Sequence, residues 1–184
     1  MDLNHTKATL EKAGVRFAPG LTKTKLDEAE KAYGFQFPPD LREFLAFALP
    51  ISEKWPDWRN LEDAGIRAQM GWPLEGMCFD IENNTFWLES WGHKPASLRE
   101  AFAIAKQKVG TAPRLIPVFG HRYMPDRPNS RGNPVFSVYQ TDIIHYGGNL
   151  QNYLENEFYD YFQTRKYQLP DGIRKIDFWS DLCS

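Results

Sequence analysis

Proline and glycine mark where the first clear helices of this chain begin and end. In residues 22–33, apolar side chains recur at helical spacing; Thr22 can cap the start and Gly34 can take a left-handed conformation at the end. A second helix can begin at Pro38-Pro39, because proline is tolerated in a first helical turn, and Pro50 ends it. The opening of the chain is therefore predicted to be a helical hairpin around a proline corner.

Three further helices are predicted, one before the hairpin and two after it. Ser97 and Glu100 have the spacing of a capping box, and the helix that follows over 98–109 stops at Gly110. An apolar stripe predicts another helix over 149–163. Residues 2–13 carry a weaker helical pattern.

The predicted strands lie between these helices. The first is a predicted hairpin, with strands at 77–81 and 85–91 joined by an asparagine-containing turn. Residues 51–76 predict no defined element beyond a short helix near 60–70, and residues 120–133 read as a polar loop. The remaining strands are predicted at 114–119, 134–140 and 142–146. The fold class is therefore α+β, with an antiparallel sheet flanked by helices.

Charge and length restrict the function. The 184 residues contain no linker or repeat and predict a single domain over 1–184. With 22 Lys and Arg against 24 Asp and Glu, there is no basic stripe to neutralise phosphates, which argues against nucleic-acid binding. No apolar run is long enough to span a bilayer, and the first residues lack a secretory signal. Two distant cysteines are typical of a reduced compartment, so a cytoplasmic location is expected.

Two stretches resemble a known family. The first runs from Leu21 to Gly34 and continues as Phe37-Pro38-Pro39-Asp40-Leu41-Arg42-Glu43-Phe44-Leu45. The second is Pro117 to Tyr123, followed by Gly132 to Ile144. Together they are similar to the SUKH superfamily, which includes the Smi/Knr cell-wall-synthesis regulators of fungi and many bacterial immunity proteins. Leu41 stands where that family often has an aromatic residue. The resemblance covers roughly residues 21–182.

The resemblance implies a curved antiparallel sheet with helices around it, and a non-catalytic function in binding another protein. An immunity-type member would neutralise a toxin domain by direct contact. The first alternative is a cell-wall or glucan-synthesis regulator that acts as an interaction hub. The second, from another class, is a small hydrolase that uses His121 and Asp126. The family has no shared catalytic constellation to carry onto this sequence, and no cofactor is expected.

His121 and Asp126 belong to the most chemically dense stretch of the chain, residues 120–129. His121 could act as a base that Asp126 orients, with a neighbouring arginine to hold an anion. The more common use of such polar side chains is to satisfy the backbone of an irregular loop. We therefore favour a structural or binding role for this loop over catalysis.

The candidate partner-binding residues are Trp91, Arg122, Tyr123 and Arg127, because Trp, Tyr and Arg dominate binding hot spots. If residues 85–91 form a strand, Glu89 shares a face with Trp91, which predicts that this face is partly exposed. The alternative is that the aromatic residues fill the core. Phe178-Trp179 in the tail is expected to dock on the body.

Neither a metal site nor an activated nucleophile is predicted. His93, His121 and His145 lie far apart and in no ligand spacing, although they could converge in space. Cys78 follows an apolar residue and Cys183 lies near the end of the chain, and neither has the surroundings of a reactive thiol.

Overall fold

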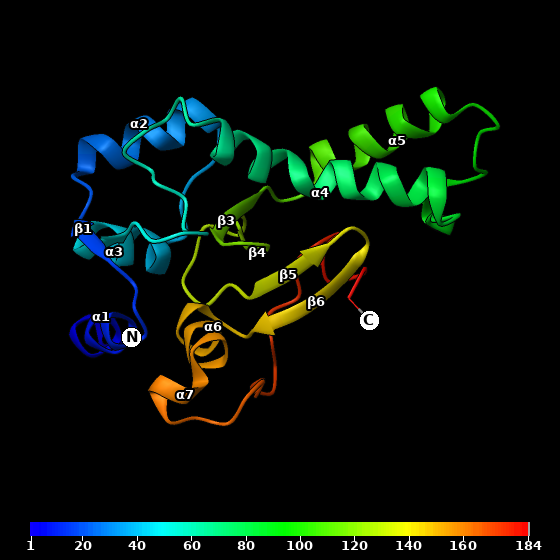
Figure 1. Cartoon of the computed structure of the whole chain (residues 1–184). Coiled ribbons are helices and arrows are strands. Elements are labelled where there is room, and N and C mark those ends of the chain that lie inside the picture. Colours follow the sequence, from blue (N-terminus) through cyan, green and yellow to red (C-terminus); the bar gives the residue numbers. More distant parts are fainter. Residues whose placement is uncertain (184) are drawn as a thin grey trace.

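The fold is known from a computed structural model, which describes residues 1–183. It is α+β, as the sequence predicts, and Figure 1 shows its arrangement. The helices are α1 (Leu3–Lys12), α2 (Lys23–Tyr33), α3 (Pro39–Phe47), α4 (Ala64–Asn83), the short 3-10 helix η1 (Glu89–Trp91), α5 (Leu98–Thr111), α6 (Leu150–Glu157) and α7 (Tyr159–Phe162). The strands are β1 (Phe17–Pro19), β2 (Ala48–Pro50), β3 (Leu115–Phe119), β4 (Arg122–Pro125), β5 (Val135–Tyr139) and β6 (Asp142–Gly147).

The strands form two antiparallel sheets. β1 and β2 make a small sheet, while β3, β4, β5 and β6 pair in sequence order as a four-stranded meander. The register shifts between Pro117 and Phe119 and again between Val135 and Phe136, and such irregularities increase the local twist. In Figure 1, α4 and α5 lie side by side above the β5–β6 hairpin and extend away from α1, α2 and α3.

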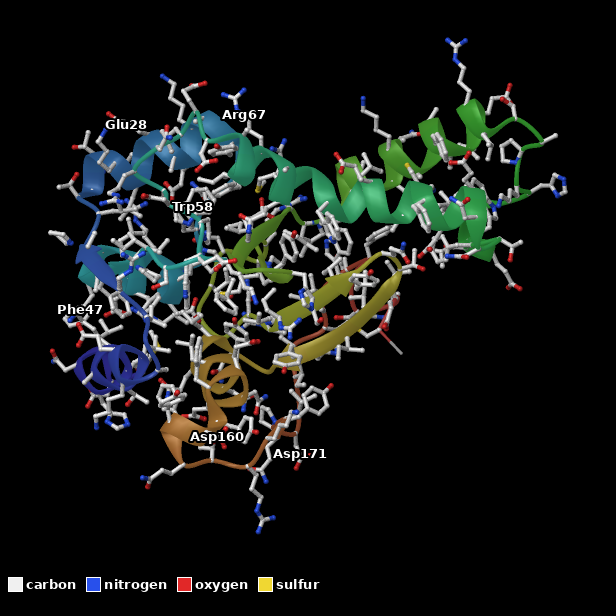
Figure 2. The ribbon with its side chains drawn as sticks, viewed as in Figure 1. Glu28, Phe47, Trp58, Arg67, Asp160 and Asp171 are labelled. Carbon is white, nitrogen blue, oxygen red and sulfur yellow. The ribbon has the colours of Figure 1, made fainter. Side chains whose placement is uncertain are left out.

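The N-terminal helical hairpin is confirmed. The Thr22 hydroxyl accepts a hydrogen bond from the Lys25 amide at 3.3 Å, and Gly34 ends α2 with φ of 69° in the left-handed region. The Trp58 ring packs edge-on against Phe35 and Phe37, with centroids 5.8 and 5.2 Å apart, at the centre of this half of the molecule (Figure 2). Burial of these aromatic rings holds α2 and α3 together.

The predicted hairpin over 77–91 is wrong. Its first strand belongs to the 20-residue helix α4, and its second strand is replaced by a loop that contains η1. Met77 and Ile81 are buried one helical turn apart and pack on Ala101 and Ala105 of α5. A short apolar run fits both a strand and a buried helix, and only the packing against α5 distinguishes them.

Pro73 lies inside α4 and has a specific partner. A proline has no N–H, so it cannot donate to the carbonyl of Gln69 four residues earlier. The Tyr123 hydroxyl of β4 donates to that carbonyl instead, at 2.9 Å. The helix therefore continues through the proline because a side chain of the sheet satisfies the backbone group that it leaves free.

Two other local predictions need correction. α5 forms as predicted, but the Ser97 side chain makes no capping hydrogen bond, so the capping box is wrong. The stretch 120–133 is not wholly a loop, since β4 occupies its first half and pairs with both β3 and β5.

The tail docks on the body, as expected. Ile176 and Trp179 are buried against β3 to β6, and the Trp179 indole N–H donates to the carbonyl of Pro113 at 2.6 Å. Within residues 1–183, no helix combines the length and the apolar character needed to cross a membrane.

Candidate functional site

The candidate site is a cavity of about 410 Å³ between α4, the β3–β4 turn and α6. Its volume lies in the range of binding sites for small groups. Its charged and aromatic lining includes Lys54, Trp72, Phe119, His121, Arg122 and Glu157. It therefore contains three of the candidate residues from the sequence, His121, Arg122 and Tyr123, together with Trp72.

Large aromatic side chains continue from this cavity along α4 and the β5–β6 turn. The side chains of Trp72, Phe79 and Tyr139 are 42%, 48% and 57% exposed. The ring of His121, itself exposed, meets Tyr139 edge-on with centroids 6.5 Å apart. We call these four residues the aromatic surface.

A glycine allows the two parts of the aromatic surface to meet. Gly76 lies on the same face of α4 as Trp72 and Phe79, at positions four and three residues away. A Cβ atom on Gly76 would be 2.7 Å from the Cα of Gln140, which follows Tyr139 in the β5–β6 turn. The turn can therefore touch the helix backbone only because residue 76 has no side chain.

Asp80 fixes the same junction. Its buried carboxylate accepts hydrogen bonds from the amide and the hydroxyl of Thr141, at 2.9 and 2.5 Å, and one from the Asn84 side chain at 2.6 Å. Burial alone would raise the pKa of Asp80, but these hydrogen bonds outweigh it and hold the pKa below its usual value. The exposed aromatic rings thus stand on a rigid base.

Arg122 and Tyr123 are not exposed anchors, and that prediction is wrong. The Arg122 side chain is 11% exposed; it pairs with Glu157 at 3.0 Å, lies 3.8 Å from the centre of the Tyr146 ring and donates to the Ser137 hydroxyl at 2.8 Å. Tyr123 is 1% exposed, and its hydroxyl donates to the carbonyl of Gln69. Both side chains hold elements together.

Trp91 and Arg127 also make internal contacts. The Trp91 ring lies parallel to that of Phe178, with centroids 6.4 Å apart, so it joins the α4–α5 pair to the tail. The half-exposed Arg127 donates to the carbonyls of Thr111 and Ala112, at 3.2 and 2.7 Å, where its charge suits the C-terminus of α5. The strand-face reasoning from Glu89 does not apply, because η1 replaces that strand.

His121 and Asp126 do not come together. His121 precedes β4 and Asp126 follows it, so a four-residue strand, about 16 Å including its flanks, separates them. Asp126 is buried, and its carboxylate accepts from the Arg114 amide at 2.8 Å. Partial desolvation of the ring and the charges of Arg122 and Lys54 lower the pKa of His121, so the imidazole is neutral at pH 7. Within residues 1–183, no carboxylate hydrogen-bonds to His121 in the way that the hydrolase alternative requires.

The tail brings Cys183 and His145 together, which the sequence did not reveal. The Cys183 sulfur lies 4.0 Å from His145 Nε2, and the Ser180 hydroxyl lies 3.3 Å from the same nitrogen. Burial raises the pKa of the Cys183 thiol to about 11 and lowers that of His145, so both groups are neutral at pH 7. In residues 1–183, no three His, Cys, Asp or Glu side chains are grouped to hold a metal ion.

Comparison of the chain with protein-family models, curated proteins and solved structures finds no match. The resemblance to the SUKH superfamily therefore stays a prediction.

Sequence reasoning missed the aromatic surface almost entirely. Trp72 and Phe79 are seven residues apart, a spacing that puts both on one face of a helix. Pro73 hides this signal, because a proline between them argues against a continuous helix. Tyr139 could not be connected to them at all, since it is 60 residues or more away in the chain.

Proposed function

We propose that this chain is a non-catalytic protein-binding domain and that its partner docks on the aromatic surface. The observation that carries the proposal is the exposure of Trp72, Phe79 and Tyr139 where Gly76 and Asp80 lock α4 to the β5–β6 turn. Exposed aromatic residues on a rigid base supply contact area at little cost in side-chain entropy. The remaining exposed large apolar side chains lie on other elements.

Charge in the adjoining cavity indicates the chemistry of the partner. Glu157 neutralises the charge of Arg122 by pairing with it, whereas Lys54 forms no ion pair within residues 1–183. The Lys54 ammonium group lies 6.0 Å from the centre of the Phe119 ring, at the wall of the cavity. We infer a partner surface with an apolar patch for the aromatic rings and a carboxylate that faces Lys54.

The resemblance in residues 21–182 supports an immunity-type version of this function, in which the partner is a toxin domain whose active site is covered on binding. A cell-wall regulator would use the same surface to hold a partner without inhibiting it. The two versions differ in one measurable result, the activity of the partner in the complex.

Affinity measurements on matched variants test the proposal. A partner captured from the native cell would be purified and titrated by calorimetry against Trp72→Ala, Tyr139→Ala and the control Tyr161→Ala. Tyr161 lies on α7 and is 51% exposed, so it matches Tyr139 in type and exposure. We expect each of the first two variants to weaken binding by about 2 kcal/mol, roughly thirtyfold, and the control to leave it unchanged.

Equal affinities for all three variants would refute the aromatic surface as the docking site. Binding of a second copy of this chain, lost in the same two variants, would replace the foreign partner with a homodimer. Hydrolytic activity that disappears in His121→Ala would refute the non-catalytic assignment.

A further inference from the structure

A second concave region lies on the opposite side of α4 from Trp72. It is a groove of about 520 Å³ between α2, α4, α5, the start of β3 and the tail. Successive residues of an α-helix are about 100° apart, so positions 70 and 74 point away from position 72. The apolar lining of the groove includes Met70, Pro73, Leu74, Val109, Leu115 and Trp179.

The groove contains cations and no anion. Arg67, Lys106 and Arg114 line it, and none of its lining residues is an aspartate or a glutamate. Lys106 is exposed and forms no ion pair within residues 1–183. In Figure 2, Arg67 projects outward near the start of α4.

The other two cations have partners that leave their charge available. Arg67 pairs with Glu62 at 2.5 Å, but both side chains are more than half exposed, and such surface pairs contribute little. Arg114 donates to the carbonyl of Tyr33 at the end of α2, at 2.5 Å, and a carbonyl does not neutralise a guanidinium. An apolar groove with this rim is complementary to a molecule with an apolar body and a negative end.

We propose that this groove binds a small monocarboxylate with an apolar chain. The chain would lie against Met70, Leu74 and Val109, and the carboxylate would face Arg67 and Lys106. This site is separate from the aromatic surface and does not depend on the proposed function.

The distribution of apolar residues favours a small molecule over a protein segment. Nine large hydrophobic side chains among residues 1–183 are exposed, and none of them lines the groove. Its apolar atoms are thus confined to the concave interior, whereas a docking surface for a protein extends over exposed rings, as it does at Trp72 and Tyr139.

The test is an NMR titration of the full chain with three probes of equal chain length: hexanoate, 1-hexanol and hexylammonium. The Trp179 indole N–H, which lies at the groove, reports on binding. We expect hexanoate to shift this signal and to bind about tenfold to a hundredfold more tightly than hexanol, because only the carboxylate gains charge-assisted hydrogen bonds. Hexylammonium should bind more weakly than hexanol.

Charge variants sharpen the result. Arg67→Gln with Lys106→Gln should reduce hexanoate affinity about tenfold and leave hexanol affinity unchanged. Lys12→Gln with Arg165→Gln removes the same charge at exposed positions outside the groove and should change neither. Equal affinity for hexanoate and hexanol, or no shift of the Trp179 signal with any probe, would overturn the proposal. Tighter binding of the acidic peptide acetyl-Leu-Glu-Leu-Leu-amide than of hexanoate would assign the groove to a protein segment instead.

Discussion

The two sides of α4 expose their apolar residues in opposite ways. On one side, Trp72, Phe79 and Tyr139 stand outward on a base fixed by Asp80. On the other side, Trp179 is 1% exposed and the apolar atoms face inward beneath a cationic rim. One helix thus carries exposed aromatic rings on one face and borders a concave, cation-rimmed groove on the other. The difference lies in which neighbour packs on each face, a sheet turn or the chain's tail.

The largest expected effect on stability is the difference between replacing a tryptophan on one side of α4 and replacing one on the other. Trp179→Ala removes a buried ring from the groove and should lower the free energy of unfolding by about 3–5 kcal/mol. Trp72→Ala removes a ring that is 42% exposed and should cost no more than about 1 kcal/mol. Urea denaturation of the two variants measures both. Similar losses would show that the aromatic surface is part of the core and is not free for a partner.

A smaller effect should come from Tyr123→Phe. The change leaves the Gln69 carbonyl without a donor, because Pro73 cannot supply one, and should destabilise the protein by about 1–3 kcal/mol. In a Pro73→Ala background, an N–H returns to the helix and the same substitution should cost less. Denaturation of the single and double variants gives the coupling energy. An identical cost in both backgrounds would contradict the role assigned to the hydroxyl.

Replacing one glycine on each side of α4 by alanine should change the stability in opposite directions. Gly76→Ala puts a Cβ atom 2.7 Å from the Gln140 backbone and should destabilise by about 1–3 kcal/mol while shifting the NMR signals of Trp72 and Tyr139. Gly110 borders the groove, and an added Cβ there meets nothing within 4 Å. Gly110→Ala should stabilise α5 by about 0.4–1 kcal/mol. Thermal denaturation compares the two, and a stabilised Gly76→Ala would disprove the close contact.

The smallest expected effect is a loss of stability at low pH, where Asp80 becomes protonated. The folded-state pKa of Asp80 is lowered, so its contribution to stability is present above the unfolded value of about 3.9 and is lost as the pH falls through the folded value. In acid, the junction at Thr141 should therefore weaken, as seen by faster exchange of the Thr141 amide, while the groove side keeps its protection. Asp80→Asn should flatten this pH dependence. A wild-type profile that matches the variant would show that Asp80 does not titrate as described.

Local signals in the sequence predict much of the fold. The helix over 23–33 follows from a cap, a periodic apolar face and a left-handed glycine, and each of these acts within a few residues. The strands at 115–119 and 135–139 likewise lie within their predicted bounds. The candidate site is different. Trp91, Arg122, Tyr123 and Arg127 were chosen by residue type and by a predicted strand that does not form, and neither reveals burial.

The sequence by itself determined the α+β class, the N-terminal helical hairpin, the docking of the tail and the absence of a basic stripe, because these depend on composition and short-range pattern. Only the tertiary structure decided that residues 77–83 are helical. Their short apolar pattern fits both a strand and a helix, and packing against the buried face of α5 favours the helix. It also decided which aromatic rings face solvent. Trp72 and Tyr139 lie on the same surface because Gly76 has no side chain, which lets the β5–β6 turn approach α4. No local sequence pattern predicts this contact.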